Sequence, residues 1–423
     1  MKARESLLNL ALRGLSMGAR FLLIFYLGKY FSLDNLGLYG IFFTTVTLSY
    51  FLLGLDFYTY SNREVLYARN EDKLSVLRDQ LAFYLVTYTV FLLPLLLVFF
   101  YDILPLKYIV FFYFILVFEH LSQELYRVFT MLSYPVFANW LLFLRSGSWI
   151  YLIILGWIIM PDKNYSLSVI WWGWMMGSGL SVIIGVIEIL RLYKGHGLRR
   201  MQFAWFVAGL KISVLYFGST IALKIIEYSS RYLIEYWWSI KDVGVFTFFS
   251  QIANMINVAI STLLIMIIYP KLVHAVNENN VLEFYRLKKY MLKRILFYSI
   301  ALGVLVSVLI EPMLYFINKN DFYGEVNLFY VLILSNIVFN VGLVYYYVLY
   351  AFHRDFSLFV TTAFSGVSNV ALNMILIKYF GIMGAAISTL LSYVIFMILN
   401  AHVSKKAESF FWAANRGVNS INP

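Results

Sequence analysis

The sequence lacks cysteine and is poor in charge. Without Cys, the 423-residue chain has no disulfide, no thiol nucleophile and no cysteine-bound metal. Its five His are scattered without the spacing of metal ligands, so we expect no metal site and no cofactor. Charged residues make up only 13% of the chain, against about 25% in soluble domains. A soluble globular protein is therefore excluded.

The chain is rich in apolar residues. They make up 62% of the chain, and a helix needs about 20 of them in a row to cross a bilayer. The sequence predicts an all-α polytopic membrane protein with about twelve transmembrane helices, at 6–30, 36–60, 80–101, 104–128, 135–160, 165–190, 206–230, 243–268, 291–311, 326–350, 356–379 and 382–403. Arg13 and Arg20 interrupt the first apolar segment, so we expect it to be a retained span and not a cleaved signal peptide.

The net charge of +11 follows the positive-inside rule. If the N-terminus lies in the cytoplasm, most Lys and Arg fall in cytoplasmic loops and helix ends. This bias predicts that both termini are cytoplasmic, and it leaves no excess charge that calls for a nucleic-acid partner. The loops on the opposite side hold six Lys: Lys29, Lys107, Lys163, Lys241, Lys319 and Lys378.

Two stretches of the sequence repeat each other. FSLDNLGLYG at 31–40 matches WSIKDVGVFT at 238–247 with an offset of 207 residues, which pairs Gly37 with Gly244. The same offset pairs NEDKL at 70–74 with NENNV at 277–281. We expect a helix-connecting turn at each first stretch, in which the glycine takes a positive φ or allows close backbone approach.

The repeat predicts the architecture. It divides the chain into an N-terminal six-helix half, 1–200, and a C-terminal six-helix half, 201–423. Since six is even, both halves enter the membrane from the same side, and the repeats are parallel. We expect two bundles facing each other across a central cavity. Gly384, Ser388 and Ser392, at four-residue steps, predict close helix packing, and the tail at 405–423 is expected to be disordered.

Five cations lie inside predicted spans, where each would cost roughly 2.5 to 3.5 kcal/mol at the bilayer centre. The first helix of each half carries such a stripe, with Arg13 and Arg20 in one and Lys224 and Arg231 in the other. We therefore predict a cationic cavity that binds an anionic substrate. Snorkelling to the interface stays open for Arg13 and is disfavoured for Arg20, which lies deeper. The predicted cavity residues are Arg13, Arg20, Arg145, Lys224 and Arg231.

Three carboxylates in predicted spans have open roles. Glu227 lies one helical turn from both Lys224 and Arg231, where it neutralises them or, alternatively, binds a coupling Na⁺ or H⁺. The same ion-coupling alternative stays open for Asp56 and Glu119. Near the cytoplasmic rim we expect a pair formed among Glu119, Glu124 and Arg127.

Three segments carry a resemblance to a known family. FSLDNLGLYG, SRYLIEYWWSIKDVGVF at 230–246 and IKYFGIMGAAISTLLSY at 377–393 resemble the polysaccharide biosynthesis transporters. These are the O-antigen and capsule repeat-unit flippases of the multidrug/oligosaccharidyl-lipid/polysaccharide (MOP) exporter superfamily. The resemblance covers essentially the whole chain. Family members commonly carry Asp before the Arg of the second motif, where this chain has Ser230, so the role of that Asp is open here unless Glu227 or Glu235 replaces it.

The resemblance implies a flippase of the bacterial inner membrane. Its substrate would be an undecaprenyl-diphosphate-linked oligosaccharide, moved from the cytoplasmic to the outer leaflet by alternating access. Implied partners are the lipid-linked oligosaccharide, the bilayer, and a polysaccharide polymerase with its chain-length machinery. Open alternatives are a multidrug exporter of the same fold and a peptidoglycan-precursor flippase. An enzyme such as a polymerase is not expected, because the short loops leave no room for a catalytic domain.

Overall fold

The computed structural model describes residues 2–160, 166–194 and 200–419, all of which lie in helices or short connections, with no strand among them. The chain divides into two compact units. Unit 1 comprises residues 1–31 and 38–217, and unit 2 comprises residues 32–37 and 218–423. The predicted functional halves, 1–200 and 201–423, stay a prediction; the units divide within α10, after Phe217.

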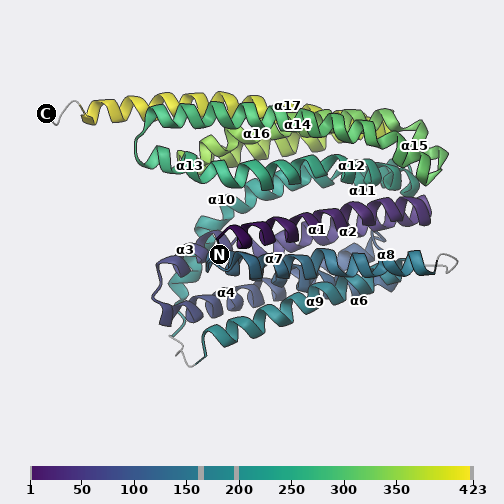
Figure 1. Cartoon of the computed structure of the whole chain (residues 1–423), viewed down its shortest axis with the longest axis horizontal. Coiled ribbons are helices and arrows are strands. Elements are labelled where there is room, and N and C mark those ends of the chain that lie inside the picture. Colours follow the sequence, from purple (N-terminus) through teal and green to yellow (C-terminus); the bar gives the residue numbers. More distant parts are fainter. Residues whose placement is uncertain (1, 161–165, 195–199, 420–423) are drawn as a thin grey trace. The chain divides into compact units, whose positions relative to one another are not determined.

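Unit 1 is built from helices α1 to α9 and the first part of α10 (Figure 1). The longest of them, α1, has 29 residues. The helices are α1 (Lys2–Tyr30), α2 (Leu33–Gly54), α3 (Tyr58–Tyr67), α4 (Asn70–Phe91), α5 (Leu97–Phe100), α6 (Ile109–Met131), α7 (Pro135–Phe143), α8 (Trp149–Ile159) and α9 (Leu167–Leu192).

Unit 2 comprises the start of α2, residues 32–37, and the chain from within α10 onward, which contains the longest helices. In it, α14, α16 and α17 pack side by side (Figure 1). The helices are α10 (Phe203–Tyr228), α11 (Ser230–Trp237), α12 (Ile240–Ile260), α13 (Met266–Asn277), α14 (Val281–Ile317), α15 (Asn320–Gly324), α16 (Val326–Ala351) and α17 (Asp355–Asn419).

The described helices account for the predicted twelve spans. Ten are long and apolar enough to cross a membrane, and α4 with the segment Pro94–Phe100 makes an eleventh if this bent pair is one span. The tenth of these helices, α17, has a non-helical residue, Gly381, with φ of +58°. Side chains of residues before and after Gly381 pair as in a hairpin, for example Asn369 with Ser392. The two arms of α17 are therefore separate antiparallel spans, as the predicted boundary between 379 and 382 requires.

The third predicted span, 80–101, is wrong as a continuous helix. The axis bends by 45° between Phe91 and Pro94. Proline has no N–H to donate to the preceding turn, and its ring clashes with the carbonyl four residues earlier. The apolar pattern alone does not register this break.

The two matching decapeptides form equivalent helix starts. Ser32 Oγ accepts a hydrogen bond from Asn35 N at 3.2 Å, and Ser239 Oγ accepts one from Asp242 N at 3.1 Å. A Ser at this place satisfies an N–H group that the first helical turn leaves without a partner. The repeat therefore encodes the N-caps of α2 and α12.

The paired glycines of the repeat lie where two backbones cross in unit 2. A Cβ added to Gly37 would lie 1.9 Å from the carbonyl oxygen of Ile240, and one added to Gly244 would lie 2.2 Å from that of Leu33. The contact is reciprocal, because Leu33 is the equivalent of Ile240 in the repeat. Neither glycine has a positive φ, so close backbone approach, and not turn geometry, is the reason for glycine here.

Both repeats also interrupt their second helix at the equivalent place. The break follows Gly54 in α2, where Leu55 and Asp56 have φ of 46° and 50°. With the offset of 207, Gly54 corresponds to Ser261, which begins a π-helical segment, Ser261–Ile265, between α12 and α13. Sequence patterning predicted one continuous span at each place.

A line of buried polar side chains joins the arms of α17. Asn373 accepts from Ser388, Asn369 donates to Ser392 at 3.1 Å, and Thr361 donates to Asn400 at 3.1 Å. At the fold of the hairpin, a Cβ on Gly384 would lie 2.0 Å from Leu376 O. The close packing predicted for Gly384, Ser388 and Ser392 is confirmed.

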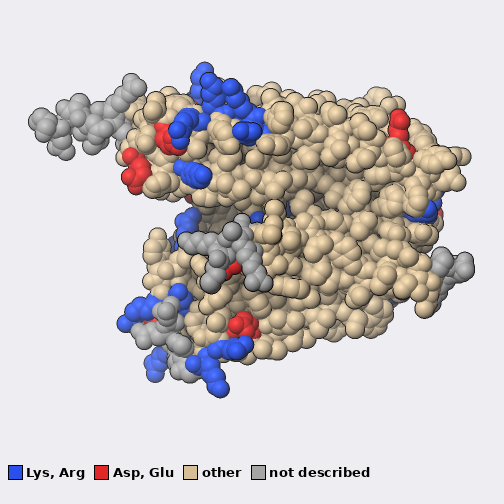
Figure 2. Space-filling model, viewed as in Figure 1, with Lys and Arg blue, Asp and Glu red and all other residues tan. Residues whose placement is uncertain are grey.

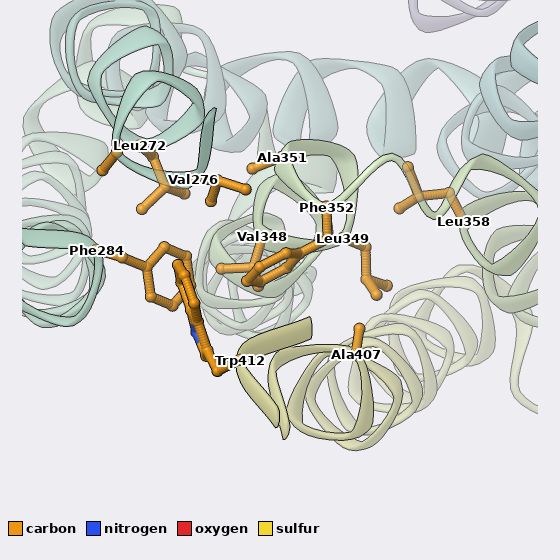
Figure 3. Packing of buried hydrophobic residues seen from close by; sticks show 11 residues of the cluster. Leu272, Val276, Phe284, Val348, Leu349, Ala351, Phe352, Leu358, Ala407 and Trp412 are labelled. Atoms are coloured by element: carbon orange, nitrogen blue, oxygen red, sulfur yellow. The ribbon is translucent and has the colours of Figure 1, made fainter. Parts of the chain in front are cut away.

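A separate apolar cluster packs the C-terminal part of α17 against other helices of unit 2 (Figure 3). It joins α13, α14, α16 and α17, with Phe284, Phe352 and Trp412 in mutual ring contact. Lys288 also forms an ion pair with Glu408. The prediction that the tail from residue 405 is disordered is therefore wrong for its first part, because Trp412 is buried in this cluster; residues 420–423 lie outside the described part.

Candidate functional site

Arg20 is the most accessible of the predicted cavity cations in unit 1. It lies on α1, its side chain is exposed, and no hydrogen bond or ion pair joins it to another described residue. Arg13, two turns earlier, donates from Nε to Asn139 Oδ1 at 3.0 Å and from Nη2 to Tyr126 OH at 3.3 Å. Arg13 thus connects α1 to α7 and α6, while Arg20 keeps its donors available for an anion.

Arg145 is buried within electrostatic reach of Arg20. It lies on a π-helical segment, Leu144–Ser148, that interrupts the fifth span; such wide turns are frequent at functional sites. Its Nη1 donates to Gln123 Oε1 at 2.6 Å, and its Nε lies 3.7 Å from Glu119 Oε2. Arg145 is therefore engaged by protein groups.

The carboxylate of Glu119 is also engaged. Trp174 Nε1 donates to Glu119 Oε1 at 2.6 Å, so both carboxylate oxygens face protein partners. The structure pairs Glu119 with Arg145 of another span, and not with Arg127 of its own helix. An ion-coupling role of Glu119 stays a prediction and would require this pair to open.

A second buried charged group in unit 1 centres on Glu124. Its carboxylate accepts hydrogen bonds from Gln80 Nε2 at 3.0 Å and Tyr84 OH at 2.7 Å, and forms the expected ion pair with Arg127. The Arg127 guanidinium lies 3.5 Å from the centre of the Tyr58 ring. This group links α3, α4 and α6 through polar side chains.

Asp56 lies next to this group, in the break after α2. It is 4% exposed and within electrostatic reach of Arg127. A left-handed backbone at a residue other than glycine costs free energy and is common at functional sites. The role of Asp56 in ion coupling stays a prediction.

In unit 2, Lys224 and Glu227 form an ion pair. Lys224 Nζ lies 2.6 Å from Glu227 Oε2, and Asn254 Nδ2 donates to Glu227 Oε1 at 2.8 Å. Glu227, Asn254, Asn336 and Tyr393 are among the residues that line a cavity of about 30 Å³. A space of this size has room for a water molecule, and its amide and carboxylate oxygens are ligands that suit a monovalent cation.

Arg231 is almost fully buried, at 2% exposure. It donates to Thr247 Oγ1 at 3.3 Å, to Ser250 Oγ at 2.8 Å and to the carbonyl of Glu227 at 3.1 Å. These bonds connect α11 to α12. Binding of substrate by Arg231 stays a prediction, and in this structure its guanidinium holds helices together.

Ser230, which stands where the resembled family commonly has Asp, belongs to a neutral cluster. Its Oγ donates to Asn373 Oδ1 at 3.3 Å, and Asn373 Nδ2 donates to Ser229 Oγ at 3.1 Å. Ser230 and Asn373 are buried. Without a carboxylate here, the acidic groups of this region are Glu227 and, further along α11, Glu235.

Sequence reasoning missed the neutral members of both sites. Gln80 and Tyr84 contact Glu124, while Asn254 and Asn257 extend the Glu227 group, since Asn257 Nδ2 donates to Asn254 Oδ1 at 2.8 Å. A signal was present, because an amide inside an apolar span is costly unless it finds a hydrogen-bond partner. Charged residues alone do not reveal these amide partners.

Comparison with solved structures places this arrangement in a known fold. An inward-facing multidrug resistance MATE family transporter of the MOP superfamily matches with a TM-score of 0.73, at 14% identity, over 95% of this chain and 94% of that chain. The lipid II flippase MurJ in an inward closed conformation matches with a TM-score of 0.73, at 15% identity, over 95% of this chain and 87% of that chain. An outward-facing MATE transporter gives 0.66 at 13% identity, over 96% of both chains.

These similarities define the fold class. No protein-family model matches the sequence, and a search of the curated proteins gives no match. The chain has the all-helical, multi-pass membrane fold with two repeat bundles that MATE transporters and MurJ share. The predicted fold class is confirmed.

Proposed function

We propose that the chain is a flippase for an undecaprenyl-diphosphate-linked oligosaccharide, the repeat unit of an O-antigen or capsule. The observation that carries the proposal is Arg20, an exposed cation inside a predicted span that has no protein partner among the described residues. Such a charge is costly in a membrane unless it meets water or an anion. A diphosphate is an anion that arginine binds through paired hydrogen bonds.

The other predicted cations have supporting roles in this proposal. Arg13 and Arg145 add positive charge near Arg20 within unit 1, and Lys224 and Arg231 are the corresponding cations of unit 2. Alternating access between the two leaflets would move the head group while the polyprenyl tail stays in the bilayer. The protein would lie in the bacterial inner membrane with both termini in the cytoplasm, and would act with a polysaccharide polymerase and its chain-length machinery.

The proposal is tested in a strain that lacks the gene. Surface polysaccharide is followed by gel, and the lipid-linked oligosaccharide pool is extracted from the membranes. We expect loss of polymer together with accumulation of complete, unpolymerised repeat units that are accessible only from the cytoplasmic face. Intact polymer would contradict the proposal.

Two alternatives share the fold, and the same strain distinguishes them. Altered drug susceptibility with intact polymer would indicate a multidrug exporter, which the MATE matches keep open. Accumulation of peptidoglycan precursor would indicate a precursor flippase. The match to MurJ, over 87% of that chain, keeps this alternative open.

Replacing Arg20 by alanine is expected to reduce transport at least about tenfold, because loss of one charge-assisted bond to a diphosphate amounts to roughly 1.5 to 3 kcal/mol. Protein abundance should stay normal, since Arg20 has no protein partner to lose. Lys224→Ala is expected to act in the same direction. Arg286→Ala is the matched control, because Arg286 is an exposed cation paired with Glu283. Wild-type surface polysaccharide in the Arg20 variant would disprove its assignment.

We further propose that Glu227 couples transport to Na⁺ or H⁺. Its two carboxylate oxygens have different partners, Lys224 and Asn254, and the small cavity beside it offers an ion a place next to the carboxylate. Glu227→Gln is expected to abolish the dependence of transport on the ion gradient, measured in vesicles with imposed Na⁺ or pH gradients. Glu311→Gln, at an exposed carboxylate on α14, is the control, and an unchanged gradient dependence in the Glu227 variant would refute the proposal.

A further inference from the structure

A groove in unit 1 lies between α4, α6 and α9, apart from the predicted cavity cations. Its volume is about 450 Å³, and ten of its fourteen lining residues are Leu, Val or Ile. The other four are Arg78, Gln80, Tyr84 and Glu124. Three of these four bind one another, because Gln80 and Tyr84 donate to Glu124. The groove therefore presents mainly hydrocarbon.

The groove has the length of one bilayer leaflet. On α4 its lining residues run from Leu74 to Tyr84, which is about 15 Å at 1.5 Å per residue. The hydrocarbon core of a bilayer is about 30 Å thick. Leu81 on one wall is 46% exposed and Leu190 on the other is 61% exposed, so both walls continue onto the outer surface of the helices.

The side chains that bridge α4 and α6 are polar and sparse. Besides the Glu124 group, Tyr88 OH hydrogen-bonds His120 Nδ1 at 2.6 Å, whereas the closest backbone neighbour of α4 is α3. Space thus remains between α4 and the α6–α9 pair, and an apolar chain that fills it would gain contacts with all three helices.

Two cations mark the end of the groove that is predicted to be cytoplasmic. Lys73 precedes the lining residue Leu74, and Lys194 follows Leu190 by one helical turn. Neither forms an ion pair with another described residue. Figure 2 shows that Lys and Arg gather at the end of unit 1 where α4 begins and α9 ends. We name Lys73 and Lys194 the basic rim.

We propose that the groove binds one acyl chain of an anionic phospholipid from the leaflet on the basic side, with the lipid phosphate between Lys73 and Lys194. A phospholipid chain fits this groove because the lining is apolar, the length is that of one leaflet, and the groove opens onto the outer surface of the helices. Phospholipids are also the molecules that surround a membrane-spanning helix. The basic rim selects a negative head group. The bound chain would hold α4 against α6 and α9.

The test is native mass spectrometry of the full-length protein in detergent, titrated with phosphatidylglycerol or phosphatidylethanolamine. We expect one tightly retained phosphatidylglycerol. Val186→Trp, which fills the groove from α9, should weaken its retention about tenfold, a difference of 1.4 kcal/mol. Ile187→Trp is the matched control, since Ile187 is an exposed neighbour on α9 outside the groove lining. Lys73→Gln with Lys194→Gln should remove the preference for phosphatidylglycerol.

Several outcomes would overturn the proposal. Equal weakening by the Val186 and Ile187 variants would mean unspecific lipid at the helix surface, and equal retention of both phospholipids by the wild type would remove the role of the basic rim. Displacement of phosphatidylglycerol by an equimolar polyprenyl phosphate would assign the groove to the transported lipid. If the Val186 variant does not purify as a single species, Leu81→Trp fills the groove from α4. The result is independent of the transport assay, so it stands or falls separately from the proposed flippase activity.

Discussion

Replacing Gly37 by alanine is expected to abolish transport and to lower the melting temperature of the purified protein by about 5 to 10 °C. The added Cβ would lie 1.9 Å from the carbonyl oxygen of Ile240. A backbone carbonyl at the start of a helix cannot rotate away as a flexible side chain can, so α2 and α12 would have to separate. Gly244→Ala is expected to act alike, because its Cβ would lie 2.2 Å from Leu33 O.

Other glycines of the chain serve as controls for this prediction. Gly14 on α1 and Gly324 on α15 have no heavy atom within 4 Å of an added Cβ, so alanine there should be neutral or slightly stabilising, as it usually is within a helix. Thermal unfolding followed by intrinsic fluorescence, together with the polysaccharide assay, measures both effects. Wild-type stability of Gly37→Ala would show that the close crossing is absent from the folded protein.

Replacing Glu124 by leucine is expected to destabilise the protein by about 3 kcal/mol, because Arg127, whose side chain is only 18% exposed, would remain without its carboxylate. Gln80 and Tyr84 would lose their acceptor in the same step. The double variant Glu124→Leu/Arg127→Leu removes both charges and should recover more than half of the loss. A double-mutant cycle on the denaturation midpoints measures this recovery.

An exposed pair on α9 provides the control for the cycle. Glu188 lies 3.8 Å from Arg191, whose side chain is 80% exposed. Exposed ion pairs contribute only about 0 to 1 kcal/mol, so Glu188→Leu should change the midpoint little. A Glu124 variant as stable as the Glu188 variant would mean that water reaches Arg127, and the buried charged group would then be a solvated site.

The sequence analysis did not predict which neutral polar residues contact the buried charges. Charges inside spans stand out from the sequence because of their cost, and the five predicted cations all lie in helical segments. The sequence did not show that Arg145 and Arg231 are engaged by protein groups while Arg20 is exposed. That difference depends on amides and hydroxyls such as Gln123 and Ser250, which lie 22 and 19 positions away along the chain.

The sequence by itself determined the all-helical membrane fold with its many apolar spans and the equivalent starts of α2 and α12. These follow from local physics, since a span needs a run of apolar residues and an N-cap needs a Ser at one position. Only the tertiary structure decided the reciprocal contact of Gly37 and Gly244 and the partners of each buried charge. Those depend on which backbones and side chains far apart in the sequence meet, because inside a membrane every polar group must find its partner within the protein.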